Sequence, residues 1–146
     1  MDIAEAPVRP SSISLGIRAN LAQFALLVGV NGLVGALVGQ ERSLVPLLGE
    51  RVFAVGSSTA LMLFIVSFGL AKATANLAAG YLADRIGRKK VLLLGWAFGV
   101  PVPIALMLAP GWSWIIAANV LLGINQGLAW SSTVVMKIDL AGPRQR

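Results

Sequence analysis

Residues 80–90 read Gly-Tyr-Leu-Ala-Asp-Arg-Ile-Gly-Arg-Lys-Lys and separate two long apolar runs, 52–83 and 91–109. A helix of about 20 apolar residues is long enough to cross the hydrocarbon of a bilayer, and both runs approach or exceed that length. Asp84 is expected to end the first helix at the water interface, and Gly87 is free to take the positive φ of a tight reversal. The stretch therefore predicts a short basic turn between two membrane helices.

The composition of the chain also indicates a membrane protein. Of its 146 residues, 57% are apolar and 12% are charged, and the mean hydropathy is +0.81. About a quarter of the residues of a soluble domain are charged, and a chain this short could not bury so much apolar surface in one water-soluble core. These values exclude a soluble enzyme and a disordered tail.

The sequence contains neither cysteine nor histidine. Disulfides and thiolate metal sites need cysteine, whereas histidine-based triads, HExxH zinc motifs and imidazole proton shuttles need histidine. No phosphate-binding loop of the P-loop type is present, so direct coupling to ATP has no support. We therefore expect no catalytic residue, no metal and no cofactor.

Two further apolar runs, 19–40 and 112–136, complete the prediction of an all-α membrane protein with four transmembrane helices. Residues 41–51 are predicted to form a short loop, because they hold several charges, a proline and a glycine. Prolines 101 and 103 are expected to bend the third span, since proline removes a helical hydrogen bond. The predicted regions are a cytoplasmic tail, a four-helix membrane region and a cytoplasmic loop at residues 1–18, 19–136 and 137–146.

The distribution of basic residues predicts the orientation. With four spans, the side that holds both termini and the turn at 84–90 carries Arg9, Arg18, Arg85, Arg88, Lys89, Lys90, Lys137, Arg144 and Arg146. The opposite side carries only Arg42 and Arg51. Basic residues gather in cytoplasmic loops, so both termini are expected in the cytoplasm and the protein in the cell (inner) membrane. The net charge of +6 then faces anionic lipid rather than nucleic acid.

The residue order G-x-L-A-D-R-x-G-R-K at 80–89 resembles the signature loop between helices two and three of the major facilitator superfamily of secondary transporters. Residues 139–146 are similar to the loop that follows helix four in this family, in which an acidic residue precedes an arginine by about seven positions. The resemblance implies a twelve-helix fold in two six-helix halves. This chain would supply the first four helices, its partners being the bilayer, a small solute that the sequence does not identify, and the missing helices.

The resemblance also implies a gate on the cytoplasmic side. Its motif comprises Gly80, Asp84, Arg85, Gly87, Arg88 and Lys89. Asp84 would face the N-terminus of a helix in the missing half, and Asp139, Arg144 and Arg146 form the second part of the latch, with Arg144 or Arg146 as the ion partner of Asp84. The alternative is that Asp84 is an ordinary helix-end carboxylate, worth a few tenths of a kcal/mol.

Polar residues on the first and fourth spans are candidates for a substrate cavity, because the resemblance places these helices along it. Asn31 lies in the middle of the first span. Along the fourth, Asn119, Gln126 and Thr133 recur every seven residues and share one helical face with Trp130. The alternative is that these amides only hydrogen-bond between packed helices. Asn119 occupies a position at which many proton-coupled members carry arginine, so coupling by that route is not expected.

Lys72 is the one charge deep within an apolar run, 12 residues before Asp84 and so about 18 Å away along a helix. A lysine at the middle of the membrane costs roughly 2.5–3.5 kcal/mol, and such residues usually face the interior of a helical bundle. Lys72 would there suit an anionic substrate group or a carboxylate. The alternative is that its side chain extends to the cytoplasmic surface.

Glycine pairs spaced by four residues occur at 35/39, 95/99 and 123/127. Such pairs let helices approach closely, as we also expect at Gly80. Two alternative functions stay open beside the facilitator-type transporter. One is a small four-helix multidrug exporter acting as a dimer, which would need an ionisable group in its first span, where residues 19–40 hold no carboxylate. The other is a membrane remnant that transports nothing.

Overall fold

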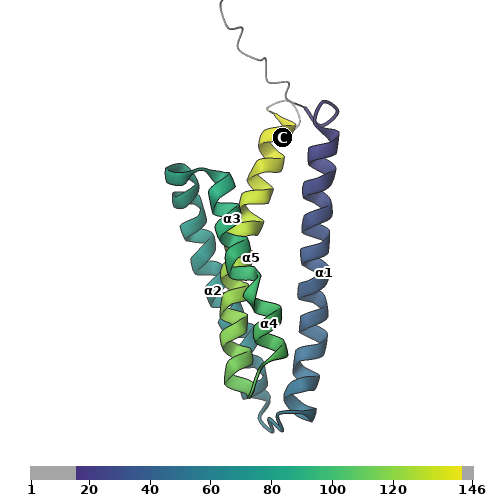
Figure 1. The fold of residues 1–146 in the computed structure, drawn as a ribbon, viewed down its shortest axis with the longest axis vertical. Helices are drawn as coiled ribbons and strands as arrows, with labels where there is room; N and C mark the ends of the chain where they lie inside the picture. The colour runs from purple at the N-terminus through teal and green to yellow at the C-terminus, as the bar shows by residue number, and fades with distance from the viewer. Residues whose placement is uncertain (1–15, 143–146) are drawn as a thin grey trace, which may run out of the picture.

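The computed structural model describes residues 16–142, which form five α-helices and no strand (Figure 1). The predicted all-helical fold is therefore confirmed over that range. The helices are α1 (Leu21–Arg51), α2 (Ser58–Ile86), α3 (Arg88–Gly99), α4 (Pro101–Met107) and α5 (Trp112–Ala141).

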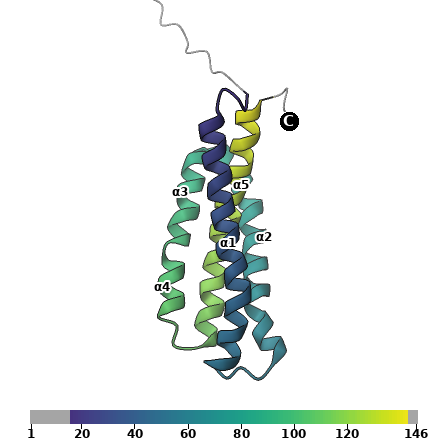
Figure 2. The same cartoon turned by 90° about the vertical axis from the view of Figure 1, so that its right-hand side faces the viewer.

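The chain runs alternately up and down one long bundle, with α3 and α4 following each other in the same direction as one broken helix (Figure 1). The start of α1, the α2–α3 turn and the end of α5 lie towards one end, whereas the α1–α2 and α4–α5 connections lie at the other (Figure 2). Three helical segments in the described part of the chain are long and apolar enough to cross a membrane, namely α1, α2 and residues 88–107. Four crossings remain a prediction, because α5 carries several amides in the middle of its 30 residues.

Helix α5 lies at the centre of the bundle and packs most closely against α2. A Cβ atom on Gly123 would stand 2.5 Å from the Phe68 carbonyl oxygen, and one on Gly127 would stand 2.5 Å from the Ala75 Cβ. A Cβ atom on Gly95 of α3 would likewise stand 2.9 Å from the Ala129 backbone nitrogen of α5. These glycines let helix backbones meet, as predicted.

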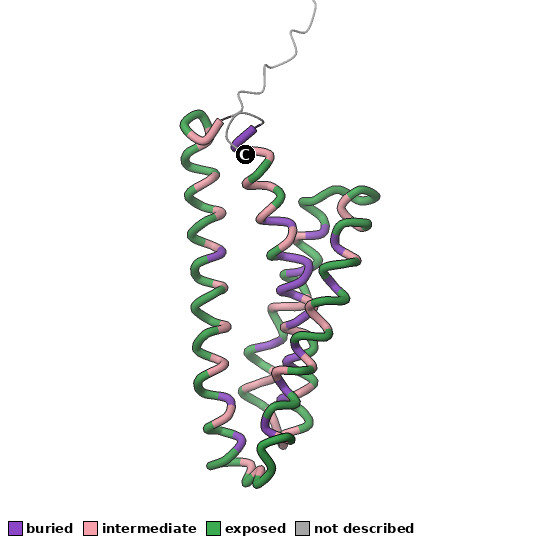
Figure 3. The backbone as a smooth tube through the Cα atoms, turned by 180° about the vertical axis from the view of Figure 1, so that it is seen from behind, coloured by how far each residue is buried: buried purple, intermediate pink, exposed green. Residues whose placement is uncertain are grey.

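The prediction that glycines bring helices close together is wrong at three other glycines. A Cβ atom on Gly35, Gly39 or Gly80 would have no neighbour within 4 Å. Most of α1 is exposed (Figure 3), and only Asn31, Val45 and Gly49 are buried along it. A glycine pair brings helices together only where it faces one, and the pair at 35/39 does not.

The prediction of a loop at residues 41–51 is wrong, because α1 continues to Arg51. Pro46 removes only one hydrogen bond from the helix, and tertiary contacts on either side of it hold the helix in place. Val45 belongs to a buried cluster with Phe64 and Ile115. A Cβ on Gly49 would lie 2.9 Å from the Trp112 ring, so the indole packs directly on this turn of α1.

The start of α2 explains why the apolar run at residues 52–83 is longer than one membrane span needs to be. Residues 52–57 lie outside the helices, and α2 begins at Ser58, where the hydroxyl of Ser57 accepts a hydrogen bond from the Ala60 backbone nitrogen at 3.4 Å. Gly87 separates α2 from α3 with φ of 84°, which confirms the positive φ expected there. The third span is interrupted at Val100, as expected from two prolines that lack backbone N–H groups.

The last helix also extends beyond its predicted end. Helix α5 continues to Ala141, so residues 137–141 are helical rather than the start of a loop. Gly142 follows with φ of 76°, and its backbone nitrogen donates to the Ile138 carbonyl oxygen at 3.2 Å. The division of the chain into tail, membrane region and loop otherwise stays a prediction.

Candidate functional site

The turn between α2 and α3 is joined to the end of α5 by an ion pair. Arg88, the first residue of α3, pairs through Nη1 with Oδ2 of Asp139 in the last turn of α5. Both side chains are about two-fifths exposed (42% and 43%), and a pair in such a setting contributes about 1 kcal/mol or less. The contact therefore brings together two predicted gate residues without locking them.

Asp84 is exposed in the last turn of α2 and makes no ion pair within residues 16–142. It lines a hollow of about 170 Å³ between α2 and α5, together with Arg88, Ser131 and Ser132. Its predicted partners, Arg144 and Arg146, lie outside the described residues, so that pairing stays a prediction.

The other residues of the turn are also at the surface. The Arg85 guanidinium lies 4.4 Å from the centre of the Tyr81 ring. This contact holds Arg85 on its own helix, whereas Lys89 is exposed beside Arg88. Among the described members of the motif, only Arg88 therefore makes an ion pair with another helix.

The predicted polar stripe on α5 faces α1. The Thr133 hydroxyl donates to Asn31 Oδ1 at 2.8 Å, and this hydrogen bond joins the two helices. Gln126 and Asn119 are 3% and 1% exposed, so the whole stripe is buried although it is polar. Asn119, Gln126 and Thr133 are thus buried together on α5, whereas Trp130 is exposed, and whether these polar residues bind a solute stays a prediction.

Trp130 turns instead towards α2. The Lys72 Nζ lies 5.7 Å from the centre of the Trp130 ring and 5.7 Å from that of Phe68. Lys72 is half-buried and has no carboxylate partner in the described part of the chain. Aromatic faces attract a cation, so the two rings hold the ammonium group while leaving its charge unneutralised.

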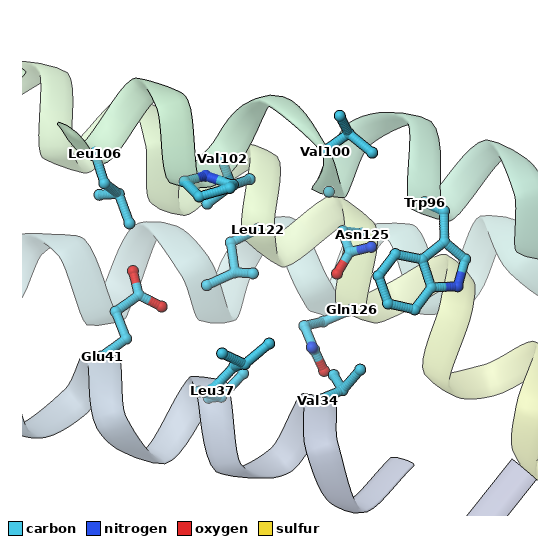
Figure 4. A pocket seen from close by; sticks show the side chains of 13 residues that line it. Val34, Leu37, Glu41, Trp96, Val100, Val102, Leu106, Leu122, Asn125 and Gln126 are labelled. Atoms are coloured by element: carbon cyan, nitrogen blue, oxygen red, sulfur yellow. The ribbon is translucent and has the colours of Figure 1, made fainter. Parts of the chain in front are cut away.

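A cavity of about 350 Å³ lies between α1, α5 and the broken helix α3–α4 (Figure 4). Its wall is mainly aliphatic, with Trp96, Asn125 and Gln126 in it and the carboxyl group of Glu41 at one end. The Asn125 side chain links α5 to α3, because its Nδ2 donates a hydrogen bond to the Gly95 carbonyl oxygen at 2.9 Å. The Gln126 amide makes no hydrogen bond within residues 16–142 and points into the cavity.

Glu41 is the residue that sequence reasoning missed, because the end of an uncharged run was interpreted as the end of the helix. A signal was present in the spacing. Val34, Val38 and Glu41 stand three to four residues apart and so share one helical face, which is the face that lines the cavity. Residues 19–40 hold no carboxylate, but α1 continues beyond them and includes Glu41.

Long apolar helices around a buried polar face define a multi-pass membrane protein. The family model of the Major Facilitator Superfamily matches residues 20–146, so the chain belongs to this superfamily, whose members are in general transporters rather than enzymes. No curated protein and no solved structure matches the chain.

Proposed function

We propose that this chain is the N-terminal four-helix part of a secondary transporter that moves a small solute by alternating access. It would lie in the inner membrane, with both termini in the cytoplasm and further helices of the same carrier as partners. The observation that carries the proposal is the Arg88–Asp139 pair, which ties the α2–α3 turn to α5 at the predicted cytoplasmic end. The family match supports the transporter class.

In this proposal the α2–α3 turn is one half of a latch. Asp84 is exposed and carries no counter-ion within residues 16–142, so its charge is available to the positive N-terminal end of another helix. Arg88 and Asp139 set the position of the turn against α5. Opening of the carrier towards the cytoplasm would break the contact between Asp84 and the N-terminal end of the other helix, and closing of the carrier would restore this contact.

Replacement of Asp84 by asparagine tests the latch. In proteoliposomes that contain the chain together with the further helices of its carrier, we expect Asp84→Asn to lower the saturable uptake of a transported solute about tenfold or more, because coupling energies of 1–3 kcal/mol are typical of such contacts. A transported solute can be found by counterflow with radiolabelled sugars, organic acids and amines. The isosteric change should leave membrane insertion intact, as resistance to alkaline extraction would show. Normal uptake by Asp84→Asn would overturn the latch, and a complete wild-type carrier that transports none of these solutes would favour the non-transporting alternative.

We further propose that Lys72 interacts with an anionic group of the solute or with a carboxylate of the partner helices. Its ammonium group is half-buried between Phe68 and Trp130 and lacks a counter-ion in the described range. Lys72→Gln should raise KM for uptake about tenfold, since a hydrogen bond to a charged group is worth about 1.5–3 kcal/mol. Lys90→Gln, at an exposed position, is the matched control. A change in expression alone would favour a lysine that merely extends to the surface.

The presence of Glu41 in α1 keeps one alternative open, that of a four-helix exporter acting as a dimer. Such a protein needs an ionisable group in its first helix, and the observed helix supplies one. Cross-linking in membranes separates the two possibilities, because an exporter of this kind is a dimer whenever it is active, whereas the facilitator-type carrier needs no second copy of this chain.

A further inference from the structure

The cavity between α1, α5 and the broken helix α3–α4 has Glu41 in its wall, and Glu41 and the nearby Asn119 each carry a buried acceptor atom without a donor. Glu41 Oε1 and Asn119 Oδ1 are both buried and both lack a hydrogen-bond partner. The two side chains are neighbours, but the Asn119 Nδ2 donates to the Ile115 carbonyl oxygen at 3.1 Å. Leaving a buried acceptor unsatisfied costs about 1–3 kcal/mol, so this corner of the bundle lacks a donor.

The nearest basic side chain does not fill that role. Arg42 follows Glu41 directly, yet its guanidinium lies on α2, 4.4 Å from the centre of the Phe68 ring and 5.8 Å from that of Phe64. Glu41 forms no ion pair, since the pair found within residues 16–142 joins Arg88 to Asp139. The carboxyl group of Glu41 therefore has no ion-pair partner in the described part of the chain.

The other residues of the cavity indicate the size and shape of a ligand that could supply the missing hydrogen-bond donor. Its volume of about 350 Å³ lies within the range of small-molecule sites. Aliphatic side chains such as Leu37 and Leu106 form most of the wall, and the Trp96 ring lies at the end away from Glu41 (Figure 4). The Gln126 amide, 3% exposed and without a partner in the described residues, points in from the side.

We infer that this cavity binds a lipophilic amine in its protonated form. The ammonium N–H groups would donate to Glu41 Oε1, the apolar body would lie along Leu37 and Leu106, and an aromatic end would reach Trp96. A cationic donor is favoured because the free atom belongs to a carboxyl group that has no ion-pair partner within residues 16–142. A neutral alcohol of the same shape could donate one hydrogen bond but would supply no counter-charge, and hydrogen bonds between ionised groups are the stronger ones. An anionic molecule would supply neither a donor nor a counter-charge. The inference depends on the proposed function only in regarding the bound amine as a transported solute.

Binding can be measured without transport. The probes are 4-phenylbutylamine, 4-phenylbutanol and 4-phenylbutanoate, which share one apolar body and differ in charge. With the protein in lipid nanodiscs, quenching of tryptophan fluorescence reports occupancy, since Trp96 lines the cavity. We expect the amine to bind at least about tenfold more tightly than the alcohol, and the carboxylate to bind more weakly than either.

Glu41→Gln should remove the preference for the amine while leaving the affinity for the alcohol unchanged. Glu50→Gln is the matched control, because Glu50 is on the same helix but exposed. Equal binding of amine and alcohol to the wild-type protein would overturn the inference, as would a preference that survives in Glu41→Gln. Unfolding of each variant in detergent, compared with wild type, shows that the cavity is intact. A protein that transports other solutes but fails this binding test would retain the proposed function without the amine site.

Discussion

Gly127→Ala should lower the stability of the α2–α5 pair by about 1–3 kcal/mol, the usual cost of adding a group to a filled interface. The new Cβ would stand 2.5 Å from the Ala75 Cβ, 2.8 Å from the Lys72 carbonyl oxygen and 3.0 Å from the Asn76 nitrogen. Two of these neighbours are backbone atoms of α2, so no side-chain rotation relieves the clash. The helices must move apart, and the contacts on both sides of the seam weaken with them.

Titration of the purified protein with sodium dodecyl sulfate measures the effect as a shift of the unfolding midpoint. Gly35→Ala is the control, because a Cβ there meets nothing within 4 Å. Alanine in a helix is favoured over glycine by roughly 0.5–1 kcal/mol, so this variant should be as stable as wild type or slightly more stable. Equal midpoints for Gly127→Ala and wild type would show that α2 and α5 do not meet at this glycine.

Glycine spacing thus predicted part of the packing and could not predict all of it. The pairs at 95/99 and 123/127 face another helix, whereas the pair at 35/39 faces open space, although the spacing is the same. Spacing fixes which residues share a face of one helix. Which face meets a neighbour depends on contacts between residues far apart in the sequence, such as Gly123 with Phe68, and local patterns do not contain them.

The extent of the helices shows the same limit. Apolar runs predicted the positions of the helices, and Gly87 and the two prolines predicted where they turn or break. The end of α1 was misplaced because charges and Pro46 are typical of loops. Contacts of Val45 and Gly49 with α2 and α5 favour helix instead.

Part of the candidate site was predicted from the sequence and part was missed, for a related reason. The stripe of Asn119, Gln126 and Thr133 follows from helical geometry alone and is found on one buried face. Glu41 was missed because its importance comes from its surroundings in space. It lines a cavity with residues of α3, α4 and α5, and its neighbour Arg42 is held by aromatic rings of α2. Neither fact is visible in a sequence window around residue 41.

A cysteine introduced in place of Lys90 should be labelled by a membrane-impermeant maleimide only after the cell membrane is permeabilised. The natural sequence contains no cysteine, so a single introduced thiol accounts for all labelling. Lys90 is exposed beside the α2–α3 turn, at the end of the bundle that also holds the start of α1 and the end of α5 (Figure 1). Nine basic residues are assigned to that side and two to the other, and this asymmetry predicts that the side faces the cytoplasm.

Glu50→Cys provides the opposite readout, because Glu50 is exposed near the α1–α2 connection at the other end of the bundle. This variant should react in intact cells, and the expected contrast between the two sites is nearly all-or-none. The reverse pattern would put Arg88 and Asp139 outside the cell. A latch built on that pair could then not close the cytoplasmic entrance, and the role proposed for Asp84 would fail with it, whereas the packing of α2 on α5 and the amine site at Glu41 would be unaffected.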